Sequence, residues 1–366
     1  MAALRVAFDI GPLHGQRTGV GLAVDAMYNS LSRRDDVSLA PYVLSLRAPQ
    51  QAGTRRLPLP AAVALRSWAA IDRPRADRWL GDVDLVHGTN YVVPPTRLPR
   101  LVTVYDCWFL RHPTHANPAV RRAGQVLRRA IAGGASVHAS SHATGTALRE
   151  MFPAIDVQTV HLAALPLPPA PAEAPIADLA GRRYILATGT LERRKNLPRL
   201  VQAFAAIAST HRDVQLVLAG SEGDDRAEIQ TAVDALGAGV SQRVSFTGRV
   251  DDSLRAWLIR NAAVLAYPSL DEGFGFPLLD AMQAGVPVVA SNAGSIPEIA
   301  GDAALLSSPV DVEALAGNLA LALESQSVRE HLIATGTTQW QRYSWHRCAD
   351  ELAALYRRVV DESAHR

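Results

Sequence analysis

The chain has 366 residues, of which 48% are hydrophobic and 20% are charged, and its formal net charge is only +2. This composition excludes a disordered or collagen-like chain, and the length favours two domains over one. No run of about 18 uncharged apolar residues is present, and the chain opens on a strand-like segment instead of a signal-peptide core, so we expect a cytoplasmic protein. Cys107 and Cys348 lie far apart and fit neither a disulfide framework nor a metal cluster.

Charge is distributed unevenly between the two halves of the sequence. Residues 1–165 carry 19 arginines against 11 acidic residues, a net charge of +8, whereas residues 166–366 carry 18 basic against 24 acidic residues, a net charge of −6. A basic half suits an anionic partner, and a membrane surface or a lipid phosphate is the candidate. Nucleic acid is not expected, because no aromatic residues are interleaved with the arginines.

Strand-like and helix-like segments alternate in the first half. Buried strands are predicted from apolar runs at residues 4–8, 83–87, 101–105 and 135–139. Residues 117–132 form a basic amphipathic segment in which four arginines stand among four large apolar residues. This segment predicts either a helix lying on anionic lipid or a helix with a solvated basic face. Of the histidines, which lack metal-ligand spacing, His87 at a strand end is the one we expect to face the cleft.

The alternation continues after residues 163–175, whose five prolines fit neither a helix nor a central strand and predict a linker. Further strands are predicted at residues 184–188, 214–219, 243–246, 263–267 and 286–290. The pattern predicts an α/β protein with two doubly wound parallel-sheet domains and ligands at the strand ends and in the cleft between them. The predicted boundaries are an N-terminal domain at 1–165, a Pro-rich linker at 166–182, a C-terminal domain at 183–345, and a C-terminal helix at 346–366 that can pack back on the first domain.

Lys195 is the one lysine in a chain with 36 arginines. Together with Arg194 it lies between a predicted strand and a predicted helix. A compact ammonium on a flexible stem beside a guanidinium suits a diphosphate, which two cations neutralise. The alternative is a solvated basic turn.

A second segment, residues 267–290, predicts a strand, a glycine-containing loop and a helix that starts near Pro277 and ends at Gly285. Backbone amides of residues 273–276 then leave a helix N-terminus where an anion or a sugar hydroxyl can approach closely. Glu272 and Asp280 flank this helix start, and their carboxylates can accept hydrogen bonds from sugar hydroxyls. The alternative is that both acids only complement the helix dipole.

These segments resemble the retaining glycosyltransferases of family 4, through residues 189–196 (Gly-Thr-Leu-Glu-Arg-Arg-Lys-Asn), 246–250 (Phe-Thr-Gly-Arg-Val), 268–277 (Pro-Ser-Leu-Asp-Glu-Gly-Phe-Gly-Phe-Pro) and 295–302 (Ser-Ile-Pro-Glu-Ile-Ala-Gly-Asp). The first half resembles the family more loosely, through residues 17–21 (Arg-Thr-Gly-Val-Gly) and 105–113 (Tyr-Asp-Cys-Trp-Phe-Leu-Arg-His-Pro). The resemblance implies the GT-B fold, two facing Rossmann-like domains of which the first, at 1–165, binds the acceptor and the second, at 183–345, binds the nucleotide sugar.

Residue roles follow from the resemblance. It implies catalytic roles for Lys195, Arg194, Glu272 and Asp106, with the two cations near the donor diphosphate and Glu272 on hydroxyls of the transferred hexose. It implies donor-binding roles for Gly19, Gly21, Thr190, Val250, Gly273, Phe274, Gly275, Phe276 and Asp280. In these roles Val250 lines the base pocket and Asp280 contacts the ribose.

The sequence departs from the family pattern at three of these positions. Asp280 is one methylene shorter than the usual glutamate, so its ribose contact is expected to be longer or water-mediated. Thr190 replaces a common arginine, and we expect Arg194 to supply that charge. Tyr105 replaces a histidine that often contributes to the active site, which puts the catalytic role of this position in doubt although Asp106 remains.

The resemblance implies a retaining, metal-independent hexosyltransferase, and its pattern is most similar to mannosyltransferases of bacterial surface-polysaccharide assembly. The expected donor is GDP-mannose in preference to a UDP-sugar, and the expected acceptor is a glycan or a lipid-linked glycan, approached at the inner face of the plasma membrane. No cofactor is expected. Alternatives are a phosphorylase with pyridoxal phosphate on its lysine and a catalytically degenerate binding protein. Asp82 and Asp84 resemble a metal-binding acid pair, but they precede a strand instead of following one.

Overall fold

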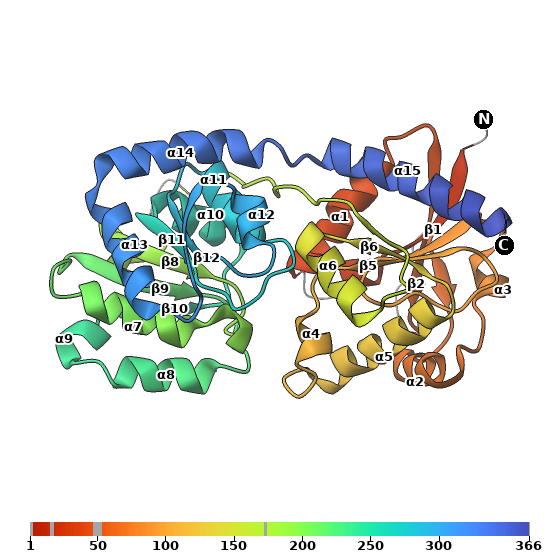
Figure 1. Cartoon of the computed structure of the whole chain (residues 1–366), viewed down its shortest axis with the longest axis horizontal. Helices are drawn as coiled ribbons and strands as arrows, with labels where there is room; N and C mark the ends of the chain where they lie inside the picture. The colour runs from red at the N-terminus through yellow and green to blue at the C-terminus, as the bar shows by residue number, and fades with distance from the viewer. Residues whose placement is uncertain (1–2, 15–17, 47–52, 172–173, 366) are drawn as a thin grey trace. The chain divides into compact units, whose positions relative to one another are not determined.

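The computed structural model describes residues 3–14, 18–46, 53–171 and 174–365 of the chain. These residues form two compact units, the first made of Met1–Ala163 with Tyr343–Arg366 and the second of Ala164–Arg342 (Figure 1). Each unit contains one sheet in which every neighbouring pair of strands is parallel. The predicted α/β fold class with two parallel sheets is confirmed.

The first unit has a seven-stranded sheet in the order β3-β2-β1-β4-β5-β6-β7. Its strands are β1 (Leu4–Asp9), β2 (Val37–Leu44), β3 (Arg55–Leu57), β4 (Leu85–Gly88), β5 (Arg100–Val104), β6 (Ser136–Ala139) and β7 (Val157–Thr159). Its helices are the 3-10 turn η1 (Gly11–Leu13), α1 (Gly19–Leu31), α2 (Ala61–Ile71), α3 (Asp77–Leu80), α4 (Trp108–Arg111), α5 (Pro118–Ala132), α6 (His142–Met151) and α15 (Trp345–Ala364). The chain leaves β1 towards β2 on one side and later returns to β4 on the other, so the strand order reverses beside β1.

The second unit has a six-stranded sheet in the order β10-β9-β8-β11-β12-β13. Its strands are β8 (Arg183–Thr188), β9 (Val214–Ala219), β10 (Val244–Gly248), β11 (Val264–Tyr267), β12 (Val288–Ser291) and β13 (Ala304–Ser307). Its helices are η2 (Ala177–Leu179), η3 (Arg193–Lys195), α7 (Leu197–Ile207), α8 (Arg226–Asp234), α9 (Ala238–Ser241), α10 (Asp252–Asn261), α11 (Phe276–Gln283), α12 (Ile296–Ala300), α13 (Val312–Glu324) and α14 (Gln326–Trp340). Here the strand order reverses between β8 and β11, and ligands of such sheets bind where two strands diverge in this way.

The strands are continuous apolar runs because helices cover both faces of each sheet. Every residue of β4, β5, β11 and β12 is buried. Helix starts are fixed by side-chain caps: Thr18 caps α1, Asp251 caps α10 and Ser344 caps α15. None of the described helices has the combination of length and apolar character that crossing a membrane requires.

Helix α5 corresponds to the basic amphipathic segment predicted at residues 117–132. Asn117 caps it, accepting hydrogen bonds from the amides of Ala119 and Val120, and its apolar stripe packs into the core of the first unit, where Val126 and Leu127 are buried. The apolar face is therefore unavailable for insertion into lipid, and this half of the expectation is corrected. Only the exposed arginines of α5 remain free to meet an anionic surface.

A chain of four buried polar side chains crosses the first unit from its C-terminal helix to its sheet. The Tyr356 hydroxyl on α15 contacts His87 Nδ1 at 2.7 Å, His87 Nε2 contacts Thr103 Oγ1 at 2.7 Å, and Thr103 Oγ1 contacts His138 Nδ1 at 2.9 Å. The chain ends where His138 Nε2 meets the Val160 carbonyl at 2.9 Å. His87 is fully buried here and lies inside the first unit, contrary to the expectation that it faces the cleft.

One arrangement of protons satisfies this whole chain. The Val160 oxygen can only accept, so His138 carries its proton on Nε2 and accepts from the Thr103 hydroxyl at Nδ1. The Thr103 oxygen then accepts from His87 Nε2, and His87 Nδ1 accepts from the Tyr356 hydroxyl. Both imidazoles are neutral in this arrangement. Burial lowers the pKa of His87 well below its usual range and that of His138 to about 4, which agrees.

Candidate functional site

The strongest site candidate lies at the carboxyl ends of β8 and β11, the adjacent strands where the order of the second sheet reverses. The loop after β8 carries η3, and the loop after β11 leads into α11. Two contacts hold these loops together: the Leu270 amide donates to the Arg194 carbonyl at 2.7 Å, and Asn196 Nδ2 donates to the Pro268 carbonyl at 2.9 Å. Residues that are distant in the sequence therefore share one edge of the sheet.

Three charged side chains meet at this edge. Glu272 Oε1 lies 2.7 Å from Lys195 Nζ, and Glu272 Oε2 lies 2.5 Å from Arg194 Nη1. Glu272 is 6% exposed and Lys195 is 9% exposed, so the contact is largely shielded from water. We refer to Arg194, Lys195 and Glu272 as the charge cluster. The cluster itself carries two cations and one carboxylate, and the Glu192 carboxylate lies 3.6 Å from Arg194 Nη2, so a diphosphate that binds here would compete with Glu192 for Arg194.

Two hydroxyl groups complete the surroundings of the charge cluster. Lys195 Nζ lies 3.0 Å from the Tyr267 hydroxyl, and the Ser269 hydroxyl donates to Glu272 Oε1 at 2.8 Å. Burial alone would raise the pKa of Glu272, but the charges of Arg194 and Lys195 and these hydrogen bonds outweigh it and lower the pKa to about 2. Glu272 is therefore ionised throughout the physiological range.

Lys195 occupies a confined position. Burial lowers its pKa while the Glu272 carboxylate raises it, and the net direction is downward. Its Nζ lies 4.6 Å from the centre of the Tyr267 ring. Gly189, with φ of 127°, packs so closely that a Cβ there would lie 3.1 Å from Lys195 Cε. The pocket thus fits a slim alkyl stem, which gives a physical reason for the one lysine in an arginine-rich chain.

The loop that carries Glu272 is braced from the β12–α12 connection. The Ser295 amide donates to the Glu272 carbonyl at 3.0 Å. Gly294 has φ of 58°, and a Cβ there would lie 2.5 Å from the Glu272 amide nitrogen. A side chain at this position would therefore push on the backbone of the catalytic candidate itself.

Gly294→Ala is expected to destabilise the second unit by about 1–3 kcal/mol, because overpacking against backbone adds to a left-handed φ. Gly181→Ala is the matched control: Gly181 has φ of 68° but has open space around it. Chemical unfolding of both variants measures the difference. Equal destabilisation by Gly294→Ala and Gly181→Ala would show that the close approach of Gly294 to Glu272 does not affect the stability of the second unit.

Helix α11 begins as the sequence predicts. Gly275 has φ of 92° and stands at the N-cap, Pro277 lies in the first turn, and Gly285 with φ of 69° follows the helix end. Gly273 and Phe274 are buried in the loop before it. The Phe274 and Phe276 rings contact each other across the helix start, with 5.4 Å between their centroids.

Asp280 on α11 is 4% exposed and forms an ion pair with Arg255 of α10 through Oδ2. Arg255 Nε also lies 3.7 Å from Asp252. Burial raises the pKa of Asp280 to about 6 despite the Arg255 charge, which lowers it. Among the residues that the structure describes, Asp280 Oδ1 has no hydrogen-bond partner. One carboxylate oxygen is thus held by the protein, and the other is buried without a partner among the described residues.

The remaining second-unit candidates lie around the same sheet edge. Thr190 is half-buried in the loop after β8, and Val250 is half-buried after β10. Sequence reasoning missed the roles of Tyr267, Ser269 and Arg255. The first two stand inside the 267–290 segment, so their nearness to Glu272 was a usable signal. Arg255 is 25 residues from Asp280, and nothing in the sequence pairs them.

Candidates in the first unit lie at the ends of β1 and β5. Asp106 follows β5, and its carboxylate accepts from the Trp108 amide at 3.0 Å and from the Tyr91 hydroxyl at 3.2 Å. The neighbouring Tyr105 hydroxyl donates to the Thr89 carbonyl at 2.8 Å, and burial raises its pKa well above its usual value. Tyr105 is therefore a neutral, internally satisfied side chain. It cannot take the acid–base part that a histidine would offer.

The glycine motif of the first half opens α1. Gly19 and Gly21 lie in its first turn, and the Gly21 amide donates to the Thr18 side chain at 3.4 Å. Arg17 of this motif lies outside the described residues. Asp82 and Asp84 both contact Arg5, the first as an ion pair and the second through the Arg5 amide at 2.8 Å.

Comparison with known proteins places the chain in a family. Residues 174–339 match the family model of glycosyl transferases group 1. O-antigen chain mannosyltransferase B of Escherichia coli is 32% identical over 299 residues, which are 78% of this chain and 77% of that protein. A phosphatidyl-myo-inositol mannosyltransferase of Mycobacterium leprae (strain TN) is 31% identical over 172 residues, 46% of this chain and 44% of that protein.

Among solved structures, sucrose-phosphate synthase from Thermosynechococcus elongatus superposes with a TM-score of 0.76 at 21% identity, covering 98% of this chain and 100% of that chain. The two Rossmann-like parallel-sheet domains are those of the GT-B glycosyltransferase fold. The protein is therefore an enzyme of the glycosyltransferase class. It belongs to the group 1 family of glycosyl transferases, whose activity is the transfer of sugar.

Proposed function

We propose that this glycosyltransferase transfers mannose from GDP-mannose to a glycan or lipid-linked acceptor, with retention of anomeric configuration and without a metal ion. The observation that carries the donor-site assignment is the buried charge cluster at the ends of β8 and β11. Mannose is favoured because the Escherichia coli relative that aligns with 78% of this chain is named a mannosyltransferase. The second unit then binds the donor, and the first unit binds the acceptor.

In this proposal the charge cluster stabilises the leaving diphosphate. As the bond between the anomeric carbon and the diphosphate oxygen breaks, negative charge grows on that oxygen, and Lys195 and Arg194 stand where fixed positive charge lowers the barrier. The acceptor oxygen bonds to the anomeric carbon on the same face. Its proton passes to the departing phosphate oxygen, so no protein base is required.

Glu272 has two parts in the proposed mechanism. It holds both cations in place, and its carboxylate can accept from hydroxyls of the bound hexose beside the amides of residues 273–276. Asp280 Oδ1, which has no partner among the described residues, is the atom proposed to accept from the ribose, while Arg255 keeps the carboxylate in position. Val250 and Thr190 line the same edge. In the first unit, Asp106, Gly19 and Gly21 are proposed to face the reacting sugar.

The enzyme is proposed to work in the cytoplasm at the inner face of the plasma membrane, where a lipid-linked acceptor is accessible. Support comes from the basic first half of the sequence and from the exposed arginines of α5. Since the apolar face of α5 is packed into the core, this contact would be electrostatic and would weaken as salt increases.

The donor is tested by thermal unfolding of the full chain with GDP-, UDP-, ADP- and dTDP-sugars, all at one concentration that is about 100 times the dissociation constant of GDP-mannose. GDP-mannose is expected to add about 2.7 kcal/mol of stability under that condition, and the other nucleotides are expected to add less. Greater stabilisation by a UDP-sugar than by GDP-mannose would overturn GDP-mannose as the donor and identify a UDP-sugar in its place. No stabilisation by any member would favour a degenerate binding protein.

The chemical course is tested on the product. Proton NMR of the freshly formed glycoside is expected to show the α anomer, as in the donor, and chelator treatment is expected to leave the rate unchanged. An inverted product would overturn the retaining mechanism. A rate that falls on chelation and returns with Mg²⁺ would overturn metal independence.

A further inference from the structure

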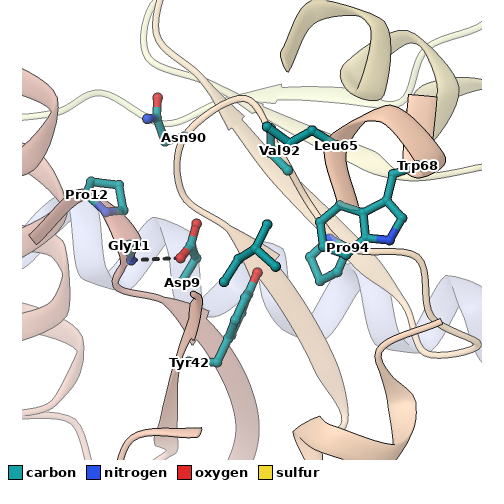
Figure 2. Close-up of a pocket in the computed structure, with 10 residues that line it drawn as sticks. Asp9, Gly11, Pro12, Tyr42, Leu65, Trp68, Asn90, Val92 and Pro94 are labelled. Atoms are coloured by element: carbon teal, nitrogen blue, oxygen red, sulfur yellow. Dashed lines mark hydrogen bonds between the residues drawn. The ribbon is translucent and has the colours of Figure 1, made fainter. Parts of the chain in front are cut away.

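A cavity of about 240 Å³ opens in the first unit at the carboxyl ends of β1, β2 and β4 (Figure 2). It lies beside β1, where the strand order of this sheet reverses. That is the position at which open parallel sheets bind ligands, yet it is distinct from the charge cluster of the second unit. The cavity is smaller than the roughly 300–1,000 Å³ of sites for drug-sized molecules, so it suits a ligand of one ring.

Two polar groups lie at the floor of this cavity, and one of them, the Tyr42 hydroxyl, lacks a hydrogen-bond partner among the described residues. Asp9 and Tyr42 are neighbours on adjacent strands, and Figure 2 shows the carboxylate and the hydroxyl pointing to the same side of the sheet. Asp9 Oδ1 accepts from the Gly11 amide at 2.8 Å. The Tyr42 side chain is buried, at 2% exposed, and its hydroxyl has no hydrogen-bond partner in the described part of the chain. A buried hydroxyl without a partner is costly, so one beside a cavity suits a site that takes a hydrogen-bonding ligand.

The rest of the lining is mostly apolar. Its walls are formed by Pro12, Leu44, Leu65, Trp68, Val92 and Pro94, with the Asn90 amide as a further polar group. The Trp68 side chain is 1% exposed and its indole N–H donates to the Pro74 carbonyl at 3.1 Å, so Trp68 closes the apolar wall without offering a hydrogen bond. A ring with hydroxyls on its edge and C–H groups on its face matches this division. That description fits a pyranose.

The charge of the described lining favours a neutral ligand over a phosphate. Among the lining residues that the structure describes there is no arginine, lysine or histidine, and the one carboxylic acid is Asp9. Burial raises the pKa of Asp9 to about 7, although the Gly11 amide opposes this, so its carboxyl group can donate as well as accept near neutral pH. Both directions of hydrogen bonding are useful for binding sugar hydroxyls.

We propose that this cavity is a subsite for one neutral hexopyranose ring of the acceptor, with the Asp9 carboxyl group and the Tyr42 hydroxyl bonded to its hydroxyls and its C–H groups against the apolar wall. The assignment to the acceptor rests on the proposed function, in which the first unit binds the acceptor. The subsite recognises a sugar and makes no contact with a phosphate.

The test is saturation-transfer NMR on the full chain with methyl α-D-mannopyranoside, methyl α-D-glucopyranoside and methyl α-D-galactopyranoside. At least one of the three is expected to bind wild type, and Tyr42→Phe and Asp9→Asn are each expected to weaken that binding about fivefold to tenfold, the value of one hydrogen bond. Tyr42→Phe should retain full stability, because the hydroxyl it removes has no partner.

Tyr184→Phe is the control, since its buried hydroxyl donates to the Leu258 carbonyl at 2.7 Å in the second unit. It should lower stability and leave glycoside binding unchanged. Binding of no glycoside by wild type, or equal binding by wild type, Tyr42→Phe and Asp9→Asn, would overturn the subsite. Thermal stabilisation by GDP-mannose in the same samples reports the second unit alone, so failure of the donor proposal is read separately.

Discussion

Lys195→Ala is expected to lower kcat about 10²–10³-fold, the usual loss when one group that stabilises developing charge is removed. The chain should remain folded, because Glu272 retains the Arg194 ion pair and the Ser269 hydrogen bond. Initial rates of sugar transfer and circular dichroism of the same preparation measure the two expectations. Loss of folding would show instead that the lysine is needed for stability.

Lys195→Arg separates charge from shape. It keeps the positive charge but brings a broad planar group to a position enclosed by Tyr267 and Gly189. We expect it to recover less than a tenth of the wild-type rate. Arg193→Ala is the matched control, because Arg193 lies in the same turn but is 43% exposed and pairs with Glu228 at 2.6 Å. Its rate should match wild type, and a comparable loss would remove the special role assigned to position 195.

The elements that the sequence predicted are those with strong apolar runs. β9 was predicted at residues 214–219 and spans Val214–Ala219, and the starts and ends of the other predicted strands agree within two residues. The strands β2, β3, β7 and β13 were not predicted. In β2, polar Ser38 and a proline at position 41 interrupt the apolar pattern, and β3 and β7 have three residues each. Such strands are stabilised by pairing with their neighbours, which local patterns do not report.

The sequence also predicted only part of the candidate site. Arg194, Lys195 and Glu272 could be proposed from motifs, because each motif ends a strand and the ends of parallel strands gather at one edge. Their mutual ion pairing could not be predicted, since it depends on the alignment of two loops 77 residues apart. The cavity beside Asp9 and Tyr42 was also invisible in the sequence. Its polar groups come from separate strands, and no spacing marks a hydroxyl that lacks a partner.

The buried histidine chain gives the second large effect, a loss of first-unit stability in acid. His138 has a folded-state pKa of about 4 against 6.5 for an unperturbed histidine. Between these values the unfolded chain binds the proton more readily than the folded chain. The contribution of neutral His138 is therefore fully present above pH 6.5 and is lost as the pH falls towards 4. A shift of this size corresponds to about 3 kcal/mol.

The measurement is the opening free energy of β6 from hydrogen exchange of residues 136–139, which reports the first unit by itself. The opening free energy of wild type minus that of His138→Gln is expected to decrease by about 3 kcal/mol from pH 7 to pH 4. The comparison with a variant is essential because Asp9, whose pKa is raised to about 7, has the opposite sign: its contribution is present below pH 3.8 and is lost as the pH rises through 7. Asp9 titrates in both proteins, so its contribution cancels in the difference between their opening free energies.

The control is His331→Gln, at an exposed position of the second unit. The difference in the opening free energy of β6 between wild type and this variant should not change with pH. A flat difference for His138→Gln would mean that the Tyr356–His87–Thr103–His138 chain accepts a proton without breaking, and that the single proton arrangement derived for it is wrong.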